Sequence, residues 1–177
     1  MKLLIGITSS IAAYRLPNII SMLRKKDIII KTVITERAKS FVAPQALAVM
    51  SQNPCLTDGD EWNFKDNVLH IELAKWCDAM IIAPLTANTL AKISNGLCDN
   101  LLTSTVRALG EKPLILAPAM NTRMWENSLT KMQLDLAEKY YKTTVISPIV
   151  KHLADGDSGM GALADDQTII DTILSLQ

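Results

Sequence analysis

The feature that most constrains this chain is a repeated alternation of short, largely apolar runs with longer segments of helical periodicity. The runs are only four to seven residues long, which is too short for typical helices. Such runs are typical of strands that a parallel sheet buries on both faces. We therefore predict strands over residues 3–7, 28–34, 79–83, 114–117 and 143–146.

The intervening segments predict helices over residues 10–26, 36–51, 70–76, 86–94, 101–108 and 127–140, with a last helix over 166–176. Strands that alternate with helices form βαβ units with right-handed crossovers. Pro17 is unfavourable inside the first helix, because an interior proline removes a hydrogen bond. The pattern predicts an α/β fold, in which residues 1–177 form a single Rossmann-like (flavodoxin-like) domain with a doubly wound parallel sheet flanked by helices.

Composition narrows the classes of function. Eighteen basic residues balance eighteen acidic ones, so no net field attracts nucleic acid or an anionic membrane. No apolar run approaches the ~20 residues that span a bilayer. Cys55, Cys77 and Cys98 lack C-x-x-C spacing, which argues against a disulfide framework or a zinc site. We expect a cytoplasmic protein with no metal, nucleic-acid or membrane partner.

Small polar side chains follow several of the predicted strands. Ser9 and Ser10 come after the first strand, Thr35 after the second, and the sequence P-L-T-A-N-T over residues 84–89 after the third. The first turn lacks the G-x-G-x-x-G pattern of dinucleotide sites, so a helix N-terminus with hydroxyls there favours a single phosphate and hence a mononucleotide. The alternative is that Ser10 and the threonines only cap helices.

Residues 118–125 read P-A-M-N-T-R-M-W and directly follow an apolar run. The carboxyl end of a parallel strand is where ligands bind, so this segment is a candidate substrate platform. Asn121 can hold a carboxylate through its amide, and Arg123 can hold an anion. The alternatives are a turn role for Asn121, a solvated Arg123 and core packing for Met120, Met124 and Trp125.

These segments together resemble the homo-oligomeric flavin-containing cysteine decarboxylases. Residues 84–89 resemble the family's P-A-S-A-N-T motif, and residues 118–125 resemble its P-x-M-N-x-x-M-W motif. The sequence H-I-E-L-A-K over residues 70–75 is similar to the helix that bears the family's active-site histidine, and residues 95–103 match a further stretch. The resemblance runs from about residue 2 to 170.

The resemblance implies FMN as cofactor, a small-molecule cysteine conjugate as substrate, and a homo-oligomer (a trimer or a dodecamer) with flavin sites between subunits. It implies that FMN is held by Ser9, Ser10, Ile11, Thr35, Thr86, Ala87, Asn88, Thr89 and Ala119. The implied catalytic residues are His70, Asn121 and Asp155. The implied substrate-binding residues are Met120, Asn121, Arg123, Met124 and Ala154.

A glycine-rich flap over about residues 148–165 resembles most the L-A-C-G-D-x-G-x-G flap of the family members that act on 4′-phosphopantothenoylcysteine in coenzyme A biosynthesis. Asp155 stands where those members have a reactive cysteine. The resemblance implies oxidation of the substrate thiol to a thioaldehyde, loss of CO2 and final formation of 4′-phosphopantetheine. Two alternatives stay open: a peptidyl C-terminal cysteine decarboxylase that forms an enethiol, and a non-catalytic FMN-binding paralogue.

Overall fold

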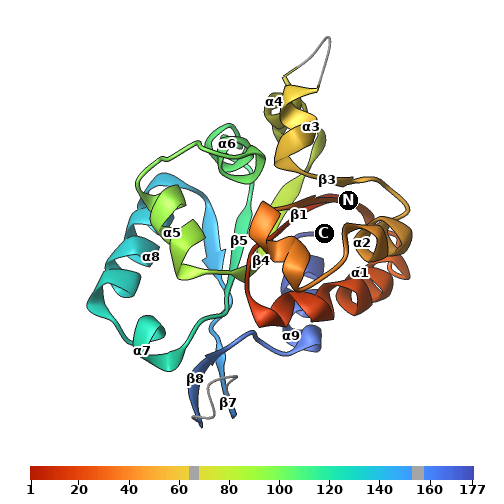
Figure 1. Ribbon diagram of the computed structural model, residues 1–177. Coiled ribbons are helices and arrows are strands. Elements are labelled where there is room, and N and C mark those ends of the chain that lie inside the picture. Colours follow the sequence, from red (N-terminus) through yellow and green to blue (C-terminus); the bar gives the residue numbers. More distant parts are fainter. Residues whose placement is uncertain (64–67, 153–157) are drawn as a thin grey trace.

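The computed structural model describes residues 1–63, 68–152 and 158–177 (Figure 1). Its centre is a six-stranded sheet in the order β3-β2-β1-β4-β5-β6, in which all neighbouring strands are parallel. The strands are β1 Lys2–Ile7, β2 Ile29–Ile34, β3 Cys55–Leu56, β4 Ala79–Leu85, β5 Leu114–Pro118 and β6 Thr143–Val145. The predicted parallel α/β sheet is confirmed; of its six strands, the two-residue edge strand β3 was not predicted.

Apolar side chains on both faces of the sheet explain why these runs form strands. Successive side chains of a strand point to opposite faces. Leu3 and Ile5 of β1 accordingly belong to one buried cluster, and Leu4 belongs to the other. Every residue of β4 is buried, as expected for a strand covered on both sides.

Helices cover the two faces of the sheet in two groups (Figure 1). The first cluster includes side chains of α1 Leu16–Arg24, α2 Pro44–Ser51 and α9 Asp166–Leu174. The second includes side chains of α4 Leu69–Trp76, α5 Ala87–Ser94, α6 Leu101–Arg107 and α8 Ser128–Tyr140. In the described part of the chain, no helix is long and apolar enough to cross a membrane.

Two segments that were predicted as single continuous helices are each divided into two helices. The segment 10–26 consists of a 3-10 helix, η1 Ile11–Arg15, followed by α1, and Pro17 lies in the first turn of α1. The segment 36–51 is likewise split into η2 Glu36–Ser40 and α2, which begins at Pro44. Proline is favourable at the first helical turn, where its missing N–H has no partner to lose. The short helices α3 Asp58–Trp62 and α7 Thr122–Trp125 were not predicted.

The glycine-rich flap contains an antiparallel hairpin of β7 Ile149–His152 and β8 Ser158–Ala162. The hairpin lies directly on the loop before α7, because the Met120 N–H donates to the Gly161 carbonyl at 2.9 Å. A Cβ atom at position 161 would lie 2.2 Å from the Met120 carbonyl oxygen, and Gly161 has φ +154°. Only glycine permits this close approach. Ala154 and Asp155, which were predicted as site residues, lie outside the described residues.

Candidate functional site

A cavity of about 600 Å³ opens at the carboxyl edge of the sheet. Its walls come from η1, from the loop between β5 and α7, from the strands β7 and β8, and from the segment that joins β8 to α9. Five of the predicted site residues line it: Ser10, Ile11, Ala119, Met120 and Asn121. The cavity thus brings together the predicted phosphate corner and the predicted substrate platform.

Asn121 is held in a defined orientation at the start of α7. Its side-chain Oδ1 accepts a hydrogen bond from the Arg123 N–H at 2.8 Å and so caps the helix. Because the carbonyl end of the amide faces the backbone, the other end of the side chain is the Nδ2 donor group. The loop is fixed on both sides, since the Ala119 N–H donates to the Leu85 carbonyl at 3.0 Å and Met120 bonds to β8. The predicted turn role and the predicted ligand role are therefore compatible at this residue.

A buried threonine ties two strand ends together beneath the site. The Thr8 hydroxyl donates to the Pro84 carbonyl at 2.6 Å and accepts from the Thr86 N–H at 3.0 Å. Thr8 is only 1% exposed, so these bonds are shielded from water. On the other side of β1, the Thr35 N–H donates to the Ile7 carbonyl at 3.0 Å. The ends of β1, β2 and β4 therefore form one connected edge, a role for Thr8 that the sequence did not suggest.

Two of the strand-end hydroxyls act as helix caps. Ser10 Oγ accepts from the Ala12 N–H at 3.4 Å, and Thr86 Oγ1 accepts from the Thr89 N–H at the same distance. Ser10 and Thr86 thus cap helices, whereas Thr35 makes no side-chain capping bond. A capping oxygen keeps its hydroxyl hydrogen for a further acceptor. The other predicted cofactor residues follow β1, β2 and β4 at this edge but are not part of the cavity wall: Ser9, Thr35, Thr86, Ala87, Asn88 and Thr89.

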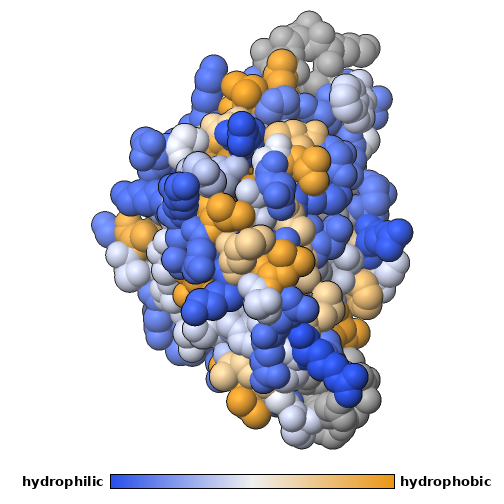
Figure 2. Space-filling view, turned by 90° about the vertical axis from the view of Figure 1, so that its left-hand side faces the viewer, coloured by the Kyte–Doolittle hydropathy of each residue, from blue (hydrophilic) through white to orange (hydrophobic). Residues whose placement is uncertain are grey.

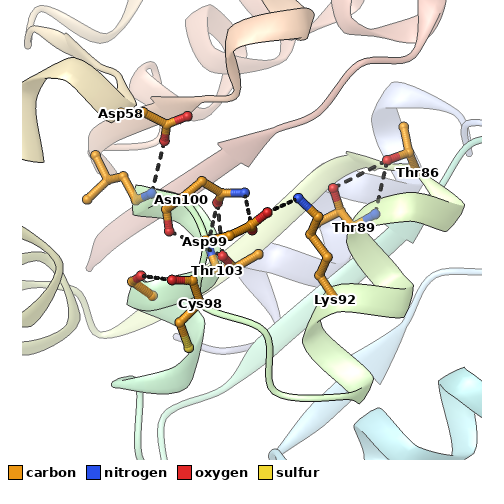
Figure 3. A network of polar contacts seen from close by, with 10 residues as sticks. Asp58, Thr86, Thr89, Lys92, Cys98, Asp99, Asn100 and Thr103 are labelled. Atoms are coloured by element: carbon orange, nitrogen blue, oxygen red, sulfur yellow. Dashed lines mark hydrogen bonds and ion pairs between the residues drawn. The ribbon is translucent and has the colours of Figure 1, made fainter.

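The segment 95–103, which matched the family pattern, forms a polar network beside α5 (Figure 3). Asn100 caps α6 by accepting from the Thr103 N–H at 2.9 Å, and its amide donates to Asp99. Lys92 of α5 pairs with Asp99, and Asp58 of α3 accepts from the Leu101 N–H at 2.9 Å. Burial raises the pKa of the Asp58 carboxyl. These contacts give the segment a structural role, because they join α3, α5 and α6.

His70 lies in the first turn of α4 and has a carboxylate partner that the sequence did not reveal. Its Nδ1 is 2.5 Å from Glu61 Oε1, and its backbone N–H donates to Glu61 Oε2 at 3.1 Å. His70 is not among the described residues that line the cavity. Figure 1 shows α4 and the β7–β8 hairpin at opposite ends of the molecule. One chain therefore does not bring His70 and Asn121 together.

The cations of the cavity differ from those that were predicted. Arg123 and Met124 are exposed on α7 and do not line the cavity, whereas Arg15 and Lys151 do. Lys151 pairs with Asp165 at 3.1 Å. Arg15 bonds to Asp166 and donates to the Leu163 and Ala164 carbonyls at 2.9 and 2.7 Å, so it holds the segment after β8 against η1.

The cavity suits a flat aromatic cofactor with an anionic tail. Ile11 and Tyr14 line it yet are 57% and 65% exposed, so they offer apolar surface that a planar ring can cover. Ser10 and Asn121 supply polar groups on two of its walls. The volume also falls within the range of about 300–1,000 Å³ that is usual for cofactor sites. The residues present therefore fit a flavin mononucleotide.

The chain is similar to known proteins over nearly its whole length. A sequence profile of the flavoprotein family matches residues 1–177. A phosphopantothenoylcysteine decarboxylase of Mus musculus is 43% identical over 175 residues, which cover 96% of this chain and 83% of the mouse protein.

Two solved structures are similar over almost the whole chain. One is a cysteine-to-serine mutant of PPC decarboxylase complexed with pantothenoylaminoethenethiol, with a TM-score of 0.91, 40% identity and coverage of 99% of this chain and 97% of that one. The other is the FMN binding protein AtHal3, with a TM-score of 0.87, 40% identity and coverage of 99% and 95%.

Proposed function

Because the chain belongs to the flavoprotein family, we propose that it is an FMN-dependent decarboxylase that converts 4′-phosphopantothenoylcysteine to 4′-phosphopantetheine. The observation that carries this proposal is the cavity at the carboxyl edge of the sheet, which combines apolar surface with the oriented amide of Asn121. A solved structure 40% identical to this chain holds a pantothenoyl thiol, which is the same class of ligand.

The residues at the strand ends would hold the cofactor. Ser10, Ile11 and Ala119 would contact FMN within the cavity. Ser9 and the start of α5 at Thr86–Thr89 would supply hydroxyl and N–H donors at the same edge. When bound, FMN would supply the two-electron oxidation of the substrate thiol, which gives the electron pair left by CO2 a place to go, and it would return the two electrons to form the saturated product.

Asn121 would bind the carboxylate that leaves as CO2. Its Nδ2 group donates without carrying a charge, so it orients the carboxylate but does not neutralise it. Holding the carboxylate beside the cofactor fixes the C–C bond that breaks, and such positioning contributes substantially to catalysis. Met120 lies next to it on the same wall and would contact the apolar part of the substrate.

His70 would accept the thiol proton, and it would do so at a site shared between two chains. One chain leaves His70 far from Asn121, so a homo-oligomer would complete the site. Exposed large apolar side chains support association: Leu97, Met124, Leu129, Met132 and Tyr140 are all exposed. Figure 2 shows apolar surface gathered over the middle of the face that carries α5 and α8. Sedimentation is expected to give a trimer or a dodecamer, and a monomer with bound flavin would exclude the shared site.

Asp155 decides how far the reaction proceeds. It lies outside the described residues, and it stands where the resembling flap has a reactive cysteine. As a carboxylic acid it would donate the proton that completes the saturated product. The absence of a cysteine at this position also favours a second candidate function, decarboxylation of a peptide C-terminal cysteine to an enethiol.

The mass of the product separates these functions. The purified protein is incubated either with 4′-phosphopantothenoylcysteine or with a peptide ending in cysteine. We expect the phosphorylated conjugate to lose CO2 alone. Loss of CO2 and two hydrogens from that conjugate would mean that the reaction stops at the enethiol. Turnover of the peptide alone would assign the second function, and an unchanged mass for both would leave a non-catalytic FMN-binding paralogue.

The remaining expectations follow from the same assignment. We treat residues 1–177 as one flavoprotein domain whose flap covers about residues 148–165, and we place the protein in the cytoplasm. In support of a reducing compartment, the three cysteines all lie in described ranges and are not joined in disulfides.

A further inference from the structure

The contact between Glu61 and His70 engages both oxygens of one carboxylate. Oε1 lies 2.5 Å from the ring Nδ1, and Oε2 accepts the His70 backbone N–H at 3.1 Å. Both side chains are largely shielded from water, with 14% of Glu61 and 26% of His70 exposed. A partly buried pair of this kind is stronger than a fully exposed ion pair.

From this geometry we infer that Glu61 is a positioning residue, which sets the tautomer of His70 and compensates the positive charge that the ring acquires. The inference rests on the proposed function, in which His70 is the base. A carboxylate can only accept hydrogen bonds, so the ring nitrogen that faces it must carry hydrogen. In the neutral ring the lone pair is then on Nε2, the nitrogen turned away from Glu61.

The proton balance of the step assigns Glu61 a definite task. The S–H bond of the substrate breaks, an N–H bond forms at Nε2, and the electron pair stays on sulfur. The ring then carries a positive charge and donates from Nδ1 to the negative oxygen of Glu61. This is the arrangement in which a carboxylate behind a histidine supports a general base.

The helix that carries Glu61 is fixed on two sides. At its start, the Asp60 carboxylate accepts from the Thr57 N–H at 2.7 Å and from the Thr57 hydroxyl at 2.8 Å. Asp58 of the same helix accepts the Leu101 N–H at the start of α6. Because α3 is only five residues long and holds both bonds, it presents Glu61 to His70 in a defined position.

A simpler role for Glu61 is to cap α4 through the His70 N–H. That role needs one oxygen, whereas the structure uses two. The substitution Glu61→Gln separates the two roles. The single side-chain oxygen of glutamine is expected to keep accepting the hydrogen bond from the His70 backbone N–H, so the side-chain NH₂ group faces Nδ1. The ring nitrogen must then become an acceptor, and the hydrogen moves to Nε2.

The matched control is Glu72→Gln on α4, the helix that carries His70. It also replaces a carboxylate by an amide, and in the described part of the chain His70 bonds to Glu61 and not to Glu72. Two readouts are compared in both variants and in the wild type: the ¹⁵N spectrum of the ring nitrogens, which reports the tautomer, and the separate values of kcat and KM. The chain has only two histidines, so the ring signals are few.

We expect E61Q to reverse the tautomer of His70 and to lower kcat at least about 100-fold, with KM changed by less than about threefold. We expect E72Q to keep the wild-type tautomer and kcat. A wild-type tautomer in E61Q, or an equal loss of kcat in both variants, would overturn the inference. If the wild type shows no turnover, the proposed function fails, and the tautomer comparison still decides the role of Glu61.

Discussion

At the scale of single residues, the surroundings of an asparagine rather than its residue type distinguish a ligand-binding side chain from one that only caps a helix. Asn121 and Asn127 make the same bond, because each accepts the N–H two residues ahead, at 2.8 and 2.9 Å. Of these two asparagines, only Asn121 is among the described residues that line the cavity. The sequence identified Asn121 through its motif, but the capping bond that orients its amide could not be predicted from that motif.

The substitution Asn121→Asp tests this distinction. Aspartate also caps helices well, so α7 is expected to persist. A carboxylate in place of the amide would repel the substrate carboxylate by about 4 kcal/mol at ~4 Å and an effective dielectric constant of ~20. We expect turnover to fall at least about 100-fold with little change in the urea midpoint. Asn127→Asp is the matched control and should retain activity; equal activity in both variants would contradict the role of Asn121.

A second residue-scale prediction compares two buried threonines, Thr8 directly after β1 and Thr32 within β2. Thr8 is 1% exposed and makes two hydrogen bonds, whereas Thr32 is 0% exposed and has no oxygen or nitrogen partner among the described residues. Thr8→Val leaves the Pro84 carbonyl and the Thr86 N–H unpaired, which should lower the free energy of unfolding by roughly 2 to 4 kcal/mol. Thr32→Val should change it by less than about 1 kcal/mol. Urea unfolding measures both, and equal effects would show that the Thr8 bonds do not hold the strand ends.

At the scale of elements, the close contact between β8 and the loop before α7 holds the flap hairpin in place. Gly161 permits this contact, since a Cβ atom there would lie 2.2 Å from the Met120 carbonyl oxygen. Gly110 has φ +67°, but a Cβ atom there would meet nothing within 4 Å. The two glycines therefore differ in whether an added methyl group clashes.

Gly161→Ala is expected to displace β8 from the loop before α7 and to destabilise the protein by roughly 2 to 3 kcal/mol. Gly110→Ala carries only backbone strain and should cost about 1 kcal/mol. Urea unfolding gives both values, and turnover should fall at least about tenfold only in the first variant. A fully active G161A would mean that the hairpin does not need to rest on the Met120 loop.

Which elements could be predicted depended on whether they bury an apolar face. The main strands were predicted because both of their faces are buried. Helix α3 reads D-G-D-E-W and buries none of its residues, so it has no apolar periodicity to detect. The spacing of Thr57 and Asp60 is nevertheless a capping-box signature that was readable in the sequence. α1 and α2 each have a proline in their first turn, which is a signal for a helix start. The prediction nevertheless ran one continuous helix through each of these positions.

At the scale of the whole molecule, the candidate site is distributed over segments that only the fold brings together. Arg15 and Lys151 line the same cavity although they are far apart in sequence. Glu61 contacts His70, nine residues further along the chain, and no sequence motif predicts this contact. Sequence motifs could identify Asn121 and His70 as candidates, but they could not show that one chain holds these two residues apart.

The most direct test of the central claim is a titration of flavin-free protein with FMN, followed by the change in flavin fluorescence. Binding of FMN at the carboxyl edge of the sheet predicts saturation at one FMN per chain, and the N121D variant should still bind because Asn121 is assigned to the substrate. A protein that stays colourless and does not bind added FMN would contradict the account.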